Sequence, residues 1–377
     1  QNMMWPKIDK EYQEELQGIA DGAKAKGVQL DVWDVVAMNA ALEWEYFVKE
    51  YNKSHGIKPA ASLVPGDHCS AFIATGSYTK DGKIVIAHNN WTNYLDGERW
   101  TIVFDIKPAK GERILMDGFP GLIHSADDFG VNSAGIVITE TTITGFSGYD
   151  PKGTPEFLRA RKAMQYSRSI DDYARIMKEG NNGGYANDWL VGDIKSNEIA
   201  SLELGLKNVT LERTKDGYFV GANFPKNPKL AAEETDFDLK DAGLSPNARR
   251  VRWEQLMAEN KGKIDVKSAQ AFMADHYDSY SKKTGPSERT LCGHVDLSPR
   301  GMGKWQPPYG IAGTVQNKAA DATMIKNMSF TAAAGHSCGG NFKAAEHLKA
   351  HPEFEWQKDL LRDLNAGPWT EFTAVGK

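Results

Sequence analysis

Short extended segments follow one another closely between residues 69 and 142, and this spacing limits the folds open to the chain. A strand from Cys69 turns at residues 79–83 and returns over 84–87, and further strands are expected over 100–106, 113–116 and 135–142. Parallel neighbours need crossovers of a dozen or more residues. Connections this short therefore predict an antiparallel sheet and disfavour a doubly wound parallel one.

A second group of strands follows two helices. The helices are expected over 155–166 and 169–179, the second with Ser169 as its N-cap. Strands over 188–193, 199–204 and 218–223 are joined by turns at 195–198 and 215–217, which predicts a meander. Later segments read as helices over 247–260, 267–275 and 341–350, with loops and strands over 290–330. Two antiparallel runs, each followed by helices, predict an α+β fold in which helices cover both outer faces of a two-sheet sandwich.

The N-terminal part has a different pattern. Residues 8–53 carry apolar side chains at helical spacing, interrupted at Gly27. The linker over 52–67 contains two prolines and two glycines and has no periodicity. A boundary or a processed loop is therefore expected just before Cys69.

Composition excludes several classes of partner. The 377 residues carry a net charge of −5, so no basic excess exists to bind nucleic acid or an anionic membrane. No apolar run reaches the roughly 18 residues of a transmembrane helix, and stable membrane insertion is not expected. The sequence starts at Gln1 rather than Met, which favours an exported protein (periplasmic, extracellular or lysosome-like) whose leader has been removed. Homo-oligomer formation is left open.

Cys69 is the candidate nucleophile. A free thiol has a pKa of about 8.5 and needs a base at neutral pH. With the turn near residues 81–82, positions whose numbers sum to about 157 to 163 face each other across the hairpin, so Cys69 faces residues 88–91. His88 is then a candidate histidine base for a papain-like thiol hydrolase.

Cleavage of the chain offers a second route to an active thiol. If the bond between His68 and Cys69 breaks, Cys69 gains an α-amine with a pKa of about 7.7 to 8.0. That amine can accept the thiol proton, so one residue supplies both nucleophile and base. The flexible, polar approach to Cys69 suits such a cleavage site.

Six short motifs stand out along the chain, at residues 67–72, 87–94, 119–129, 140–142, 184–193 and 245–252. Together and in this order they resemble the phospholipase B-like proteins, a family of the N-terminal nucleophile (Ntn) hydrolases. The N-terminal helices and the tail are more similar to bacterial cysteine acyltransferase and peptidase relatives. The resemblance implies a four-layer α-β-β-α sandwich and autocatalytic cleavage at His68–Cys69. It divides the chain into a propeptide or small subunit, 1–68, and a catalytic domain, 69–377, with the two fragments staying associated.

The resemblance also assigns roles to particular residues. Cys69 is the nucleophile and, through its amine, the base, while His88 orients the thiol or the amine. Asn90 is a polar group near the amine, and Asn187, in the Tyr-x-Asn-x-Trp motif, is the candidate oxyanion donor. Weaker catalytic candidates are Thr141 and either Arg249 or Arg252, with Arg252 preferred, and the candidate substrate-binding residues are Trp91 and Trp189.

The expected function is cleavage of an amide or acyl bond in a small, partly apolar molecule through an acyl-enzyme on Cys69. An acyltransferase, a lipid deacylase, an uncleaved papain-like thiol hydrolase and a non-enzymatic binding protein are the alternatives.

No metal or cofactor is expected. Cys292-Gly293-His294 and His336-Ser337-Cys338 superficially resemble zinc ligands, but their C-x-H spacing differs from the usual C-x₂₋₄-C pairs. Pairing of Cys292 with Cys338 in a disulfide is left open.

Overall fold

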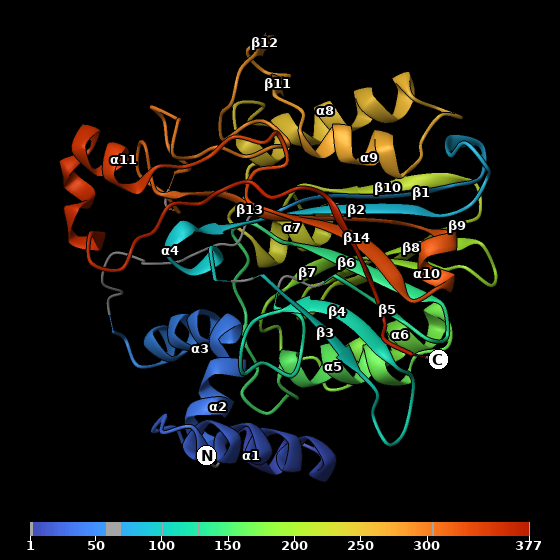
Figure 1. Ribbon diagram of the computed structural model, residues 1–377, viewed down its shortest axis with the longest axis vertical. Coiled ribbons are helices and arrows are strands. Elements are labelled where there is room, and N and C mark those ends of the chain that lie inside the picture. The colour runs from blue at the N-terminus through green and yellow to red at the C-terminus, as the bar shows by residue number, and fades with distance from the viewer. Residues whose placement is uncertain (1–2, 58–68, 100, 127–128, 304, 377) are drawn as a thin grey trace.

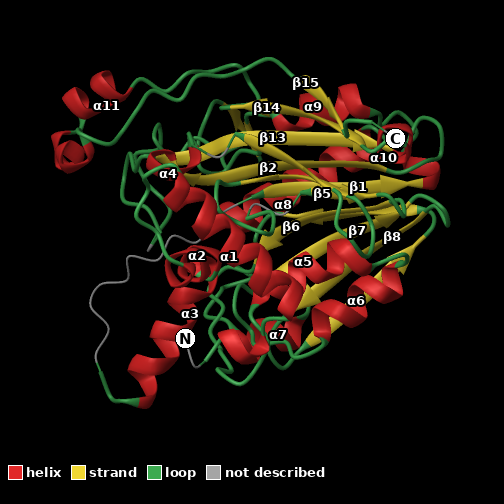
Figure 2. Ribbon diagram, turned by 60° about the horizontal axis from the view of Figure 1, so that its bottom comes forward, coloured by secondary structure: helices red, strands yellow, loops and turns green. Residues whose placement is uncertain are grey.

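The computed structural model describes residues 3–57, 69–99, 101–126, 129–303 and 305–376. Two antiparallel sheets of six and seven strands pack face to face, and helices cover the outer face of each (Figures 1 and 2). This arrangement confirms the predicted α+β sandwich with its α-β-β-α layers.

Cys69 directly precedes the second strand of the six-stranded sheet. From edge to edge its strands are β10 (Gly217–Gly221), β1 (Ser70–Thr75), β2 (Val85–Asn93), β13 (Ala312–Asp321), β14 (Ser329–Ala334) and β15 (Thr370–Thr373). Along β1, Phe72 and Ala74 pack outward against the layer of α8 (Ser245–Glu259) and α9 (Val266–Met273). Ala71 and Ile73 face the other sheet, as strand alternation requires.

The seven-stranded sheet forms the second layer. Its order is β3 (Ile102–Ile106), β4 (Ile114–Gly118), β5 (Gly130–Asn132), β6 (Ile136–Thr142), β7 (Asn187–Asp193), β8 (Glu198–Leu204) and β9 (Val209–Thr214). Helices α5 (Glu156–Tyr166) and α6 (Ile170–Lys178) pack on its outer face. The hydroxyl of Ser169 accepts from the Asp172 amide, which confirms the predicted N-cap.

The core between the sheets is built from aliphatic and aromatic side chains of both. Branched and aromatic residues of this kind suit pleated surfaces that are buried on one side. Its buried members include Ile73, Ile84, Ile86, Leu115, Phe129, Val131, Val137, Leu190, Ile199 and Phe330.

The predicted meander over 188–223 is wrong at its last strand. β7, β8 and the unpredicted β9 form a meander in the seven-stranded sheet, but β10 crosses to the other sheet and pairs with β1. A two-residue turn, Lys215-Asp216, makes this crossing. Local turn chemistry cannot distinguish a hairpin within one sheet from a corner between two, because both need the same reversal of direction.

The N-terminal helices share a core with the second sheet's helical layer. They are α1 (Lys10–Ala25), α2 (Val32–Asn39) and α3 (Ala41–Ser54). Tyr12 and Leu16 pack with Phe157 and Leu158 of α5. The division at His68–Cys69 stays a prediction, since His68 lies outside the described residues.

The remaining elements are short, and none of the helices in the described part of the chain is long and apolar enough to cross a bilayer. They are η1 (Trp5–Lys7), η2 (Gly76–Tyr78), α4 (Tyr94–Gly97), α7 (Pro228–Glu234), β11 (Tyr277–Asp278), β12 (Lys283–Thr284), α10 (Ala322–Lys326), α11 (Ala344–Ala350) and η3 (Pro352–Gln357).

Candidate active site around Cys69

The β1–β2 hairpin forms with the predicted register. Ser70 pairs with Asn89 and Ala71 with His88, so each pair of numbers sums to 159. Continued by one residue, this register places Cys69 opposite Asn90. The buried Cys69 Sγ lies 3.8 Å from Asn90 Oδ1, within reach of a weak S–H···O hydrogen bond.

The opposite neighbour of Cys69 comes from β10. Ala71 pairs with Gly221 there, and the same register continues to Asn223. The backbone N–H of Cys69 donates to Asn223 Oδ1 at 2.8 Å, and Asn223 Nδ2 donates to the Thr142 carbonyl at 2.9 Å. The backbone nitrogen of the candidate nucleophile is therefore held by a side chain whose own position is fixed from β6.

Arg249, in the first turns of α8, connects this group. Its guanidinium donates to the Cys69 carbonyl, to Ser70 Oγ at 3.1 Å and to Asn223 Oδ1 at 3.0 Å. Its Nε donates to Ser245 Oγ at 2.9 Å. The guanidinium is fully buried and lies 4.4 Å from the centre of the Trp91 ring, a cation–π distance. A planar fork of donors suits several acceptors at once, which a lysine could not match.

Charge at Arg249 is coupled to Cys69. Burial lowers the pKa of the Arg249 guanidinium to about 9, and the nearby Cys69 opposes this shift. The opposition means that a thiolate at Cys69 and a charged guanidinium stabilise each other.

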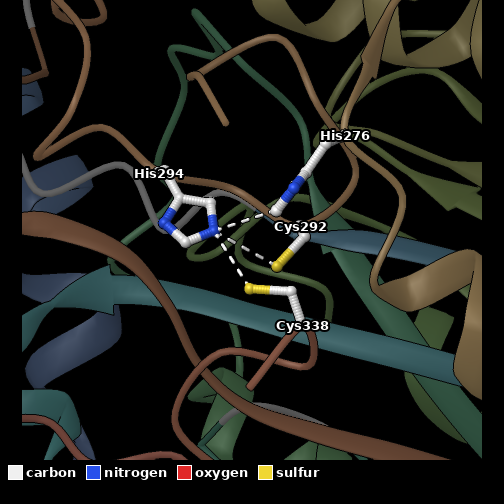
Figure 3. A group of neighbouring side chains, drawn as sticks. All are labelled: His276, Cys292, His294 and Cys338. Atoms are coloured by element: carbon white, nitrogen blue, oxygen red, sulfur yellow. Dashed lines mark hydrogen bonds between the residues drawn. The ribbon is translucent and has the colours of Figure 1, made fainter. Parts of the chain in front are cut away.

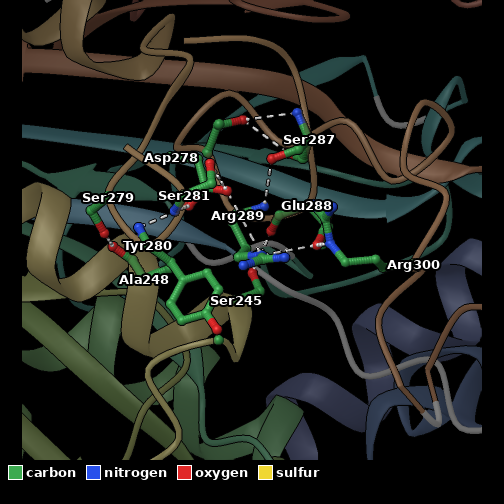
Figure 4. Close-up of polar contacts among 12 residues, drawn as sticks. Ser245, Ala248, Asp278, Ser279, Tyr280, Ser281, Ser287, Glu288, Arg289 and Arg300 are labelled. Atoms are coloured by element: carbon green, nitrogen blue, oxygen red, sulfur yellow. Dashed lines mark hydrogen bonds and ion pairs between the residues drawn. The ribbon is translucent and has the colours of Figure 1, made fainter. Parts of the chain in front are cut away.

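Arg249 is held in place through Ser245, which contacts a polar loop that contains Glu288 and Arg289. Ser245 donates to the Glu288 carbonyl, and the carboxylate of Glu288 accepts from Arg289 at 3.2 Å and from Arg300 at 2.8 Å (Figure 4). These contacts fix the position of Ser245, whose hydroxyl accepts from Arg249 and so orients its guanidinium.

A histidine and a carboxylate also approach the thiol. His88 is fully buried, and one ligand atom from each of Cys69, His88 and Glu140 lies within 4.8 Å of the others. The Tyr185 hydroxyl donates to Glu140 Oε1 at 3.1 Å. Glu140 belongs to one of the six motifs, but no local pattern places its carboxylate near Cys69.

Thr141 and the backbone of Asn187 are connected to this group through β6. Thr141 packs against Gly221, two residues before Asn223. Asn187 pairs with Thr142, whose carbonyl binds Asn223. Both polar atoms of the Asn187 amide are buried and lack a hydrogen-bond partner among the residues that the structure describes.

Two expected site residues lie elsewhere. Arg252 donates to both carboxylate oxygens of Asp275, at 3.0 and 2.7 Å, so Arg249 is the arginine that reaches Cys69. Trp189 packs in the core under α6, with its ring 6.0 Å from that of Tyr173, whereas Trp91 lies beside the site. Asn223 is not predictable from the sequence, because nothing local connects β10 to Cys69.

The family model described as Phospholipase B matches residues 1–368. The chain belongs to the phospholipase B family. This membership confirms the resemblance inferred from the six motifs. Human Phospholipase B-like 1 is 25% identical over 324 residues, covering 77% of this chain and 54% of that protein. The bovine protein of the same name is 24% identical over 318 residues, covering 77% and 55%.

The chain therefore spans about half the length of these curated relatives. Among solved structures, a mutant of the conjugated bile acid hydrolase from Clostridium perfringens aligns with 11% identity and a TM-score of 0.37. That alignment covers 70% of this chain and 88% of the other.

Replacing Arg249 with methionine is expected to lower the free energy of unfolding by about 3 kcal/mol, because several buried acceptors lose a charged donor. The next residue offers a matched control. Arg250 forms an ion pair with Glu254 at 3.2 Å near the surface, so Arg250→Met should cost less than about 1 kcal/mol. Urea unfolding followed by tryptophan fluorescence measures both, and equal losses would contradict the assigned role of Arg249.

Proposed function

We propose that this phospholipase B family member is a hydrolase in which Cys69 attacks an amide or acyl-ester carbonyl of a small, partly apolar substrate. The observation that carries the proposal is the set of contacts on Cys69. Asn90 meets its thiol, Asn223 its backbone nitrogen and Arg249 its carbonyl. A structural cysteine in an apolar core needs none of these.

In the leading mechanism, the α-amine of Cys69 is the base. Cleavage at His68–Cys69 would convert the nitrogen held by Asn223 into an amine that accepts the thiol proton. Sγ then bonds to the substrate carbonyl carbon, and the proton passes to the leaving nitrogen or oxygen as its bond to carbon breaks. Water, activated by the same amine, hydrolyses the thioester and restores the thiol. An amine acceptor in place of water would make the reaction an acyl transfer.

The proximity of Cys69, His88 and Glu140 favours a second mechanism. In this mechanism His88 accepts the thiol proton, Glu140 stabilises the imidazolium, and the chain stays intact. A thiol, an imidazole and a carboxylate that lie near one another are the side chains from which a cysteine hydrolase triad is built. The reaction catalysed is the same, and only the base differs.

Asn187 is our proposed oxyanion donor. Its amide is buried and lacks a partner in the described structure, and burying a polar group in this state costs free energy. A substrate oxygen that gains negative charge would satisfy the N–H groups. Asn187 also follows the loop that carries Tyr185, the partner of Glu140, so the same segment supports both sides of the site.

The substrate class rests on the family. The relatives are called phospholipase B-like, so lysophospholipids belong in any substrate panel beside N-acyl amino acids and short peptides. Export to an extracellular or lysosome-like compartment remains a proposal.

Cys69→Ala is expected to reduce turnover of the responsive panel substrate by more than about 1,000-fold, because no thioester can form. Product mass is the readout. Lys83→Ala, at an exposed position in the turn before β2, is the control and should keep its activity and unfolding midpoint. An active, folded Cys69→Ala protein would rule out the proposal.

Intact-mass analysis distinguishes the two bases. We expect active wild-type protein to consist of two fragments separated between residues 68 and 69, and His88→Gln to lose much less activity than Cys69→Ala once cleaved. A fully active, uncleaved chain would refute the amine mechanism. Comparable losses in His88→Gln and Glu140→Gln would then identify the histidine base.

Asn187→Ala should lower kcat by about 100-fold to 1,000-fold with little change in KM, since an oxyanion donor acts mainly in the transition state. Asn260→Ala, at the C-terminal end of α8, removes a side-chain amide far along that helix and serves as the control. An Asn187→Ala enzyme with unchanged kcat would show that another group stabilises the oxyanion.

A further inference from the structure

A second cluster of reactive side chains lies apart from Cys69. His276 follows α9, Cys292 and His294 lie in the loop before β13, and Cys338 follows β14 (Figure 3). The C-x-H spacing alone argues against a metal at Cys292, His294 and Cys338, and no local motif includes His276. The fold nevertheless brings these three distant segments together.

The four donor atoms surround a common centre. His294 Nε2 lies 3.2 Å from His276 Nε2, 3.4 Å from Cys292 Sγ and 3.5 Å from Cys338 Sγ. All four donor atoms lie within 4.8 Å of one another, and in Figure 3 the side chains point inward to the same place.

Hydrogen bonding alone cannot account for these contacts. An imidazole nitrogen carries either one N–H or one lone pair, so it satisfies one partner rather than three. A tetrahedral zinc site has Zn–N distances of about 2.0–2.1 Å and Zn–S distances of about 2.3 Å, which give N···N edges of about 3.3 Å and N···S edges of about 3.6 Å. The three distances at His294 match these edges.

We propose that His276, Cys292, His294 and Cys338 bind one zinc ion. Two sulfurs and two imidazole nitrogens in a tetrahedron are a donor set that zinc favours. The sulfur of Cys338 also accepts a hydrogen bond from the Gly340 amide at 3.4 Å, as metal-bound thiolates commonly do.

The ligand set indicates a structural metal. Four protein ligands fill a tetrahedron and leave no position for substrate or water. Cys292 and His294 are buried, while His276 and Cys338 lie nearer solvent and leave a path for the ion to enter.

The zinc would hold one wall of the site around Cys69. Gly293, between two ligands, packs against Trp91 so closely that an added Cβ would lie 2.2 Å from the indole. The same Trp91 ring lies against Arg249. Asn89, next to His88 on β2, donates to the carbonyls of Met273 and Leu291, which flank the ligand segments. The metal therefore supports the loop behind Trp91.

Metal analysis of the full chain tests the proposal. Purified wild-type protein should contain about one zinc per chain by inductively coupled plasma mass spectrometry. After exchange of the zinc for cobalt, its absorption spectrum should show the visible and thiolate charge-transfer bands of a tetrahedral S₂N₂ site. Cys338→Ser and His276→Asn should reduce zinc content at least tenfold. Cys69→Ala, which changes the third cysteine, and His55→Gln, at an exposed histidine, should keep the full complement.

Several results would overturn the proposal. The first is that wild-type protein neither contains zinc nor takes up zinc or cobalt after reduction. The second is a disulfide between Cys292 and Cys338 in the purified active protein. The third is full zinc content in the folded Cys338→Ser variant. Because Cys69→Ala should keep its metal while losing turnover, failure of the metal proposal and failure of the proposed hydrolase are separate outcomes.

Discussion

The site around Cys69 depends on one buried cation. Arg249 donates to the Cys69 carbonyl, to Ser70 and to the Asn223 side chain, and no lysine could reach these acceptors with the same geometry. Burial makes its charge costly, as the lowered pKa shows, and that cost is offset only while every acceptor stays in place. The start of β1, the end of β10 and the first turns of α8 are thus fixed relative to one another by a single side chain.

The sandwich determines what surrounds the thiol. Because β1 lies between β2 and β10, Cys69 has an asparagine on each side, Asn90 from one neighbour and Asn223 from the other. Strand alternation directs the residues at 69, 71 and 73 toward the second sheet, and Glu140 of β6 in that sheet has its carboxylate near Cys69. The proposed nucleophile and the core residues of β1 therefore lie on the same face of the strand.

The sequence predicts those parts of this arrangement that are local. The turn near residue 81 sets the hairpin register, and the register alone brings His88 and Asn90 close to Cys69. Asn223 and His276 are not predictable in this way, because their contacts depend on how distant segments meet. Helix periodicity could not separate Arg249 from Arg252 either, since residues three apart lie only about 60° apart around a helix.

Because these partners are far apart along the chain, the surroundings of Cys69 form late during folding. Cys69 contacts a side chain 154 positions away at Asn223 and another 180 positions away at Arg249. Contacts between such distant positions form slowly during folding, because the intervening chain must first be ordered. In a nascent or partly folded chain Cys69 therefore lacks these partners, and it gains them only when both sheets and α8 have come together. The surroundings proposed to make Cys69 a nucleophile therefore exist only in the completed fold.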